Sequence, residues 1–418
     1  MKILISAVTI ITVLLSACGS SSDSSDAQVS SVTKASLGES LFFDKNISLT
    51  RKTSCATCHN PEHGFVDTRF SETGVDQNIF INGAFSVGDD GSSLGGRNAP
   101  TAAYAQFIPP LSKRADGNYS GGQFHDGRAA TLTVQAGGPP LDGAEMQMSD
   151  KNAVVDRLKE NNTYVSSFKE LYGNTIFDDI NASYESMAES IAAFEKTDKF
   201  APFDSKYDKF RDCRESGKST NTCYSEGNWT NEEDLGYSLF FSSGNTNCAK
   251  CHTSNSQTEA LLGQREMFTN NRYENIGTPR NKAAMDARFH LGLQDANATF
   301  KGLGGAIEST DVDFALHLGK AKVPTLRNIA VTAPYMSNGV FSKLRTVLEF
   351  YDHQGVGTRA NNPETGLSWV ENDNNATINT SLLGSTQELP DSKIKALEAF
   401  LRTLTDAQYE SLLEPQVP

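Results

Sequence analysis

Two pairs of similar apolar segments divide the chain into two halves. Residues 37–43 have the sequence Leu-Gly-Glu-Ser-Leu-Phe-Phe, and residues 235–241 have the sequence Leu-Gly-Tyr-Ser-Leu-Phe-Phe. The second pair is Ile-Ala-Ala-Phe-Glu-Lys-Thr at 191–197 and Leu-Glu-Ala-Phe-Leu-Arg-Thr at 397–403. Each segment places apolar residues at helical spacing, so we expect an opening and a closing helix in each half. The pattern indicates an internal repeat.

Further apolar patterns predict helices inside each half. The closing helix of the first half is expected over residues 183–196, and a short helix is expected over residues 344–351. Ser149 is the expected cap of another helix. The apolar face of that helix comprises Val154, Val155 and Leu158.

The clearest amphipathic stripe lies near the C-terminus. Its apolar positions recur at intervals of three and four residues, which is typical of a helix with one buried face. Asp391 or Ser392 is the expected N-cap. The stripe comprises Ile394, Leu397, Leu401 and Leu404.

The remaining sequence is rich in loop-forming residues. Residues 64–96 contain many Gly, Ser, Asp and Asn, and residues 253–305 are expected to be mostly polar connection. Strand signals are sparse, so the predicted fold class is all-α, with two domains related by the repeat. Their expected bounds are 33–200 and 228–410, with a polar linker at 201–227.

The N-terminus has the features of an export signal. Residues 1–17 contain one Lys followed by an apolar stretch, which predicts a signal peptide. Residues 15–19, Leu-Ser-Ala-Cys-Gly, resemble a lipoprotein cleavage site, so Cys18 would carry lipid and residues 18–32 would form a flexible tether. An ordinary secretory signal is the alternative. Gly19 favours anchoring to the outer membrane.

Composition excludes one class of partner. The chain has 418 residues, 38% of them hydrophobic and 21% charged, as in an ordinary globular protein. Its formal net charge of −14 argues against nucleic acid as a partner.

Two copies of one motif indicate the cofactor. Residues 55–59 are Cys-Ala-Thr-Cys-His and residues 248–252 are Cys-Ala-Lys-Cys-His. Cys-x-x-Cys-His is the attachment signature of c-type haem, with both thiols joined to the porphyrin and the His bound to iron. The predicted cofactors are therefore two haem c groups, attached through the cysteines of both motifs. An opening helix, a haem loop and a closing helix in each half predict that both domains are cytochrome c-like. The predicted proximal ligands are His59 and His252.

Cys-x-x-Cys also occurs in zinc half-sites and in redox dithiols. A zinc site would need two more ligands in a second pair. Two of the seven cysteines remain after lipid and haem are assigned, Cys213 and Cys223. In an exported protein a disulfide between them is expected, with free buried thiols as the alternative.

Five further motifs are Arg-Asn-Ala-Pro-Thr at 97–101, Phe-His-Asp-Gly-Arg-Ala at 124–129, Glu-Met-Gln-Met at 145–148, Val-Pro-Thr-Leu-Arg-Asn at 323–328 and Thr-Ala-Pro-Tyr at 332–335. With these motifs and both haem motifs in order, the chain resembles the bacterial dihaem cytochrome c peroxidase/MauG family. The resemblance implies that the first haem is peroxidatic and that the second relays electrons. It also implies a calcium ion between the domains, at Asn98, Thr332 and Pro334.

The resemblance assigns catalytic positions near the first haem. Glu145 matches the distal acid/base of the family, and Gln135 and Pro139 match the distal pocket of the MauG branch. A carboxylate beside iron-bound peroxide can move a proton between its two oxygens. No His lies between Gly64 and Arg97, where the peroxidase branch has a blocking ligand, and His63 is too close to His59 in sequence to cross the porphyrin. The first haem is therefore expected to be open.

Three residues compete as distal ligand of the second haem. Chemistry alone nominates Met336, because thioether is a common ligand in cytochromes c. The spacing of the family pattern favours Tyr351, the ligand type of the MauG branch. His353 is the remaining alternative.

The chain departs from the family at two positions. His125 stands where the family usually has a Trp between the haems, so its expected role is electron relay, proton transfer or iron ligation. Thr246 stands where the methylamine-dehydrogenase-modifying member has a surface Trp, which argues against that protein substrate.

The predicted function is reduction of hydrogen peroxide at the first haem, with electrons delivered through the second. The expected donor is a small redox protein, a cytochrome c or a cupredoxin. Alternatives are MauG-like oxidation of a protein or organic substrate, and electron transfer without catalysis.

Overall fold

The computed structural model describes residues 32–69, 83–254 and 265–414. The predicted signal peptide and lipidation site lie outside them, as does nearly all of the predicted tether. Within the described residues no helix is both long enough and apolar enough to span a bilayer.

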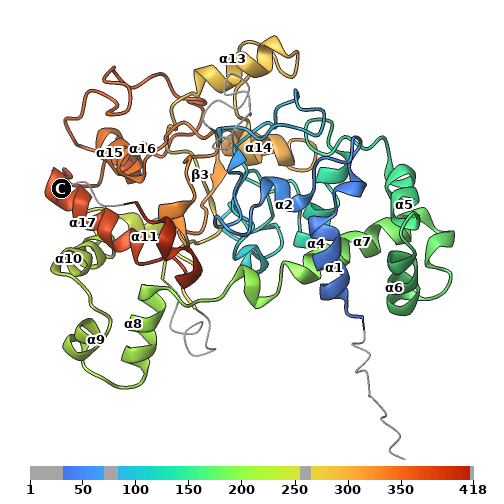
Figure 1. Ribbon diagram of the computed structural model, residues 1–418. Coiled ribbons are helices and arrows are strands. Elements are labelled where there is room, and N and C mark those ends of the chain that lie inside the picture. The colour runs from blue at the N-terminus through green and yellow to red at the C-terminus, as the bar shows by residue number, and fades with distance from the viewer. Residues whose placement is uncertain (1–31, 70–82, 255–264, 415–418) are drawn as a thin grey trace, which may run out of the picture. The chain divides into compact units, whose positions relative to one another are not determined.

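The fold is mostly helical (Figure 1). The strands form two antiparallel ribbons, which the all-α prediction did not include. β1 (Ser112–Lys113) pairs with β2 (Tyr119–Ser120), and β3 (Tyr273–Glu274) pairs with β4 (Ala321–Lys322).

We call residues 32–203 the first half and residues 204–414 the second half. The helices of the first half are α1 (Lys34–Phe43), α2 (Cys55–Cys58), α4 (Leu132–Ala136), α5 (Lys151–Lys159), α6 (Asn162–Tyr172) and α7 (Ile180–Phe194). Those of the second half are α8 (Lys206–Glu215), α9 (Thr220–Glu226), α10 (Asn231–Phe240), α11 (Cys248–Cys251), α13 (Lys282–His290), α14 (Gly302–Ile307), α15 (Leu344–Gln354), α16 (Thr380–Leu383) and α17 (Asp391–Arg402).

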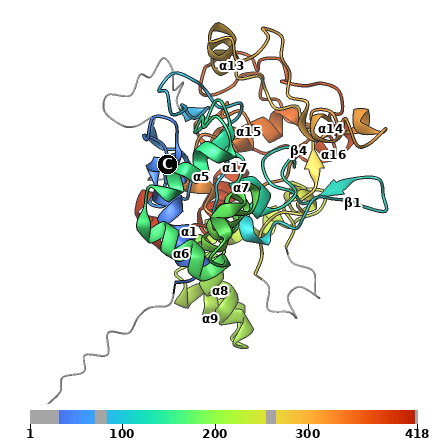
Figure 2. The same ribbon diagram turned by 90° about the vertical axis from the view of Figure 1, so that its right-hand side faces the viewer.

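All four helices expected from the repeated segments are present as α1, α7, α10 and α17. Figure 1 shows α1 beside α7, and α10 beside α17. In the view of Figure 2, α5 and α6 lie near α1 and α7; α5 contacts α7, and α6 contacts α1. Two apolar clusters result, one built from residues of the first half and the other from residues of the second half.

A glycine permits each of these helix pairs to pack closely. A Cβ atom added at Gly38 of α1 would lie 1.8 Å from the Ser190 carbonyl oxygen of α7. At Gly236 of α10 it would lie 1.9 Å from the Ala396 carbonyl oxygen of α17. The obstacle is backbone in both cases, so no rotamer change could relieve the overlap. The two helices of each pair therefore pack against each other in the same way in both halves.

Two predicted caps were wrong. Asp150, not Ser149, caps α5, because its carboxylate accepts the Ala153 amide at 2.8 Å. Pro390 occupies the N-cap position of α17, and Asp391 is the first helical residue. The Asp391 carboxylate is instead paired with two guanidinium groups, those of Arg345 at 3.0 Å and Arg359 at 2.8 Å.

Other boundaries differ from the expectation. α7 begins at Ile180 because the Asp179 carboxylate accepts amides of its first turn, and α15 continues to Gln354. Residues 253–305, expected to be connection, contain β3, α13 and the first part of α14. The polar linker contains α8 and α9, whose sequences lack a strong apolar stripe. The predicted disulfide between Cys213 and Cys223 is confirmed.

Buried polar groups join the two halves. The Tyr104 hydroxyl donates a hydrogen bond to the Asp406 carboxylate at 2.5 Å, and the other carboxylate oxygen of Asp406 accepts from the Asn328 amide at 2.7 Å. Beside them, the Arg327 guanidinium forms a fully buried ion pair with Asp208 at 2.6 Å. Such a pair is costly to break because either charge alone would be left buried.

The glycine contact gives a first prediction. Gly38→Ala should lower the free energy of unfolding by at least about 2 kcal/mol, because the new methyl group overlaps a main-chain carbonyl. Gly96→Ala is the control, since a Cβ there meets nothing within 4 Å. Denaturant unfolding of the haem-loaded proteins measures both; equal stability of the two variants would contradict the proposed contact.

Candidate functional site

The first haem motif forms a short helix that ends at His59. Ser54 precedes α2, and the Ser54 amide donates to the Thr57 hydroxyl at 2.9 Å. The His59 Nδ1 atom lies 3.1 Å from the Phe65 carbonyl oxygen. Because Nδ1 must donate to a carbonyl, the lone pair is on Nε2. Burial lowers the pKa of His59, which keeps the ring neutral, as a metal ligand must be.

The second motif repeats this arrangement. α11 ends at His252, whose Nδ1 atom lies 2.9 Å from the Phe268 carbonyl oxygen. Burial lowers the pKa of this imidazole as well. Both motifs therefore present a neutral imidazole whose Nδ1 atom is held by a main-chain carbonyl.

The four motif cysteines are unpaired thiols rather than disulfides. Burial is the largest cause of raised thiol pKa values, to about 12 at Cys58 and at Cys251. The Arg69 guanidinium acts in the opposite direction at Cys58, with its Nη2 atom 3.3 Å from the sulfur. These cysteines are reduced and adjoin the imidazoles, as covalent attachment of a porphyrin requires.

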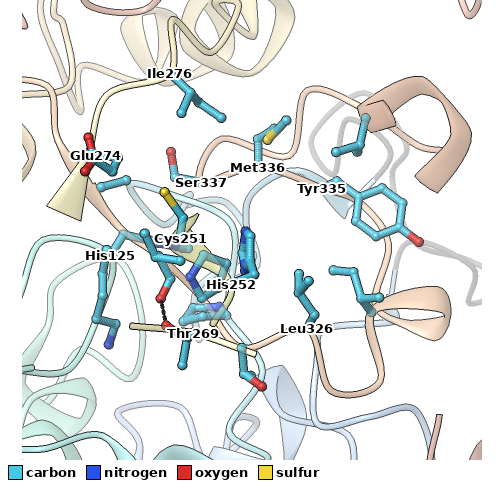
Figure 3. A pocket seen from close by; sticks show the side chains of 18 of the residues that line it. His125, Cys251, His252, Thr269, Glu274, Ile276, Leu326, Tyr335, Met336 and Ser337 are labelled. Carbon is cyan, nitrogen blue, oxygen red and sulfur yellow. Dashed lines mark hydrogen bonds between the residues drawn. The ribbon is translucent and has the colours of Figure 1, made fainter. Parts of the chain in front are cut away.

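A cavity of about 350 Å³ adjoins the second motif. Figure 3 shows Cys251 and His252 in this cavity together with His125 and Met336. Much of its lining is aliphatic or aromatic. Apolar members of the wall include Phe240, Ile276, Leu326, Leu344, Leu348 and Leu397. Two thiols, one oriented imidazole and apolar walls fit a haem c group.

Two of the three candidate distal ligands line this cavity. Both Met336 and Tyr351 contribute to its wall. Burial raises the pKa of the Tyr351 phenol, and the thiols of Cys251 and Cys248 are close enough to raise it further. The His353 ring is held elsewhere: its Nδ1 atom lies 2.9 Å from the Arg359 carbonyl oxygen, and the ring stacks on Trp369.

The predicted distal residues of the first haem share one compact turn. The Gly138 amide donates to the Gln135 carbonyl at 2.8 Å, and the Met146 amide donates to the Pro139 carbonyl at 3.2 Å. These bonds place the Glu145 segment against the end of α4. Gln135 and Glu145 are both partly buried.

Glu145 lies in an environment suited to proton transfer. Burial raises its pKa from 4.5 to about 7, and the Asp142 carboxylate raises it further, against an opposing effect of Arg128. The Glu145 charge in turn raises the thiol pKa values of both Cys55 and Cys58, so the carboxylate lies near the first haem motif. A carboxyl group poised near neutral pH can both take up and release a proton.

His125 lies where the two halves meet. Its Nε2 atom is 2.9 Å from the Asn98 carbonyl oxygen, and its own carbonyl accepts the Lys322 amide at 2.7 Å. Burial lowers the pKa of this imidazole to about 4, so the ring is neutral at pH 7. Nε2 therefore donates to Asn98, and Nδ1 is left as a hydrogen-bond acceptor.

The three predicted calcium ligands line the same cavity as His125. Asn98, Thr332 and Pro334 all contribute to its wall. The Asn98 side-chain amide donates weakly to the Gly83 and Ala84 carbonyls, each at 3.4 Å. The structure thus brings together the residues of this prediction, which lie far apart in the sequence.

Two buried charges in this region were missed by the sequence analysis. Lys322, just before the Val-Pro-Thr-Leu-Arg-Asn motif, has a pKa lowered to about 7 by burial, and its ammonium group donates to the Gly122 carbonyl at 2.6 Å. Glu195 has a pKa raised to about 8 by burial, and it raises the pKa of the Cys55 thiol. Lys322 could have been noticed because it directly precedes the motif. Glu195 follows a helical pattern, from which its burial beside Cys55 could not be inferred.

Two attachment motifs, each with a buried and oriented imidazole, define a c-type haem protein with two haems. Comparison with known proteins agrees. Residues 32–216 match the family model described as di-haem cytochrome c peroxidase. The chain is 40% identical to the methylamine utilization protein MauG of Paracoccus denitrificans, over 91% of this chain and 90% of that protein. It therefore belongs to the di-haem cytochrome c peroxidase family, whose members are oxidoreductases with two haem c groups.

Two further relatives support this assignment. The cytochrome c peroxidase Ccp of Escherichia coli is 30% identical over 73% of this chain and 50% of that protein. Among solved structures, the diheme peroxidase BthA from Burkholderia thailandensis aligns with a TM-score of 0.73 at 26% identity. That alignment covers 91% of this chain and 88% of the BthA chain.

Proposed function

We propose that this protein reduces hydrogen peroxide at its first haem site, with electrons supplied through the second. The observation that supports this most strongly is the Glu145 carboxyl, which lies close to the first haem motif and has a pKa of about 7. A haem iron with an open coordination position supplies peroxide binding and redox chemistry. In the part of the chain between Gly64 and Arg97 no His is available to block that position.

Glu145 moves the proton on which cleavage of the O–O bond depends. In its ionised form it accepts a proton from one oxygen of hydrogen peroxide and returns it to the other, which leaves as water. Gln135, near the end of α4, assists by donating a hydrogen bond to the peroxide. Net reduction consumes one peroxide, two electrons and two protons and gives two waters.

Electrons reach the first site from the second, which is held by His252. The donor is a small redox protein, a cytochrome c or a cupredoxin. His125 lies between the halves with its ring fixed by the Asn98 carbonyl, and it acts as an electron relay between the sites. Imidazole is much harder to oxidise than indole, so His125 does not itself hold an oxidising equivalent.

Tyr351 is the proposed distal ligand of the second haem. It lies on the cavity wall and near both thiols of the motif, whereas His353 is engaged by Arg359 and Trp369. A phenolate oxygen stabilises oxidised iron, and the positive charge of the metal lowers the pKa of a bound phenol. Met336 is then a wall residue.

Calcium, export and the membrane anchor complete the proposal. Carbonyl and amide oxygens of Asn98, Thr332 and Pro334 would hold one Ca²⁺ beside His125, since calcium prefers hard oxygen ligands. Absence of calcium from the purified protein in an elemental analysis would contradict the proposed calcium site. Residues 1–17 direct export, and Cys18 carries the lipid that holds the protein at the outer membrane.

A second candidate function is oxidation of a protein or organic substrate. Identity of 40% to MauG favours it. Against the particular substrate of methylamine utilization, Thr246 is buried here and its hydroxyl donates to the Leu239 carbonyl at 2.7 Å. Peroxide-driven loss of haem absorbance without oxidation of a reduced cytochrome would support this second function over peroxidase activity.

Removing the proposed base tests the mechanism. Glu145→Gln should lower peroxide turnover with a reduced cytochrome by about 100- to 10,000-fold, because positioned acid–base groups contribute that much. The haem spectrum should stay near normal. Glu185→Gln, an exposed change on α7, is the matched control. Unchanged turnover in Glu145→Gln would remove Glu145 from the mechanism.

The pH profile follows from the raised pKa of Glu145. Below pH 7 the carboxyl is protonated and cannot accept a proton from peroxide, and above pH 7 it is ionised. The rate constant for the reaction with peroxide should therefore rise with pH, with a midpoint of about 7. Stopped-flow measurements of the native protein should show this rise of the rate constant with pH, and the rise should be absent from Glu145→Gln. A rate that falls as pH rises would contradict the assigned role.

Ligand variants test the second site. Tyr351→Phe should convert the oxidised second haem from low spin to high spin, because phenylalanine offers no donor atom. Met336→Leu should leave the spectrum unchanged. Absorption and EPR spectra of the oxidised proteins measure both, and the opposite pattern would make Met336 the ligand.

A further inference from the structure

A continuous run of aromatic side chains leads from the second haem motif to the surface around α9. We call it the aromatic column, and its members are Phe268, Tyr207, Tyr237, Trp229 and Tyr224. Successive ring centroids are 5.1, 6.5, 6.4 and 5.5 Å apart. All of these separations lie within the range of contacting aromatic rings.

The inner end of the column meets the haem ligand directly. The Phe268 carbonyl oxygen is the hydrogen-bond partner of His252 Nδ1, at 2.9 Å. The Phe268 side chain is fully buried, and Tyr207 next to it is 1% exposed. The column therefore begins one hydrogen bond from the imidazole that binds iron.

The outer end of the column is open to solvent. Tyr224 and Trp229 are both partly exposed and stack on each other, and Phe210 packs against both. The adjacent disulfide from Cys223 to Cys213 links α9 to α8, which bears Tyr207. The outer end is thus tied to the element that holds the inner rings.

The chemistry of the column goes beyond what packing requires. Four of its five members are Tyr or Trp, which lose an electron far more readily than Phe or Leu. The Tyr224 hydroxyl donates to the Asp234 carboxylate, which can take the proton when the phenol is oxidised. Among the described residues Trp229 Nε1 has no hydrogen-bond partner, so its indole can be oxidised and reduced without passing on a proton.

We propose that the aromatic column is the path by which electrons enter the second haem site from a one-electron reductant at the α9 surface. This inference rests on the proposed peroxidase function, in which each hydrogen peroxide takes two electrons and two protons and becomes two waters. Each electron leaves the Trp229 indole and passes through Tyr237 and Tyr207 toward His252. When oxidised, these two phenols release their protons toward the Glu266 carboxylate, whose charge acts on both of them, and they recover the protons on reduction. The reductant then restores the indole. Tyr224, when oxidised, gives its proton to Asp234 and recovers it on reduction.

The experiment oxidises the column in the absence of a reductant. The full-length haem-loaded protein is treated with hydrogen peroxide alone, digested, and analysed by mass spectrometry for oxygen added to Trp229 and Tyr224. The unaltered chain should be modified at both residues. Tyr237→Phe retains both residues but removes an oxidisable ring between them and the haem site, so modification at both should fall several-fold.

Controls separate this path from oxidation by dissolved peroxide products. Trp369→Phe changes the other tryptophan of the chain, which is also partly exposed and lies outside the column, so modification of Trp229 should not change. Tyr207→Phe is a second interruption of the column, should Tyr237→Phe fold poorly. The haem spectrum and the rate of peroxide consumption show that each variant is intact.

Each outcome bears on the inference. Several-fold protection of Trp229 and Tyr224 in Tyr237→Phe or Tyr207→Phe, but not in Trp369→Phe, supports it. Equal modification in all variants overturns it, as does absence of modification in a protein that consumes peroxide, and both leave the peroxidase function standing. A native protein that does not consume peroxide overturns the proposed function, and this inference with it.

Discussion

In each half of the chain one main-chain carbonyl fixes the imidazole on which the rest of the site depends. Phe65 holds His59 and Phe268 holds His252, at 3.1 and 2.9 Å. The hydrogen bond sets the tautomer and burial keeps the ring neutral, so the lone pair is on Nε2, the atom with which a neutral imidazole can bind a metal. The attachment thiols are positioned by the same short helices. Without these two contacts the cysteines would still be available for attachment, but neither imidazole would have a fixed orientation.

The close helix pairs provide the rigid support for these loops. α1 and α7, like α10 and α17, meet at a glycine that allows main chain to contact main chain. The loops that bear the histidines follow the first helix of each pair. The buried Tyr104–Asp406 hydrogen bond joins the two halves beside the cavity of the second motif, and the buried Arg327–Asp208 pair stabilises the second half next to it. His125 thereby reaches the cavity from the first half of the chain.

The sequence was most informative where chemistry depends on short spacing. Both haem motifs, the four principal helices and the disulfide followed from local patterns. Two predicted caps were wrong for different reasons. In α17, Asp391 pairs with Arg345 and Arg359, which are distant in sequence. In α5, the sequence offered two neighbouring polar residues, and Asp150 rather than Ser149 is the cap. α13 and α9 were missed because neither has a strong apolar stripe.

The electrostatics of the site could not be predicted from sequence. The raised pKa of Glu145 arises from burial that depends on the whole turn from Gln135 to Met146, and the lowered pKa of Lys322 arises from contact between the halves. The resemblance to a known family pointed to Glu145 but gave no reason for its carboxyl to have a pKa near neutral. The fold supplies that reason, because desolvation places the carboxyl between its charged and neutral forms near pH 7.

The central claim is that one iron has a vacant position beside Glu145 while the other is bound on both sides. An EPR spectrum of the oxidised protein tests it most directly, because the spin state reports the number of axial ligands of each haem. The account predicts one high-spin and one low-spin ferric signal, with the high-spin signal lost when peroxide is added. Two low-spin signals, unchanged by reduction of one haem or by peroxide, would contradict it and leave a protein that only transfers electrons.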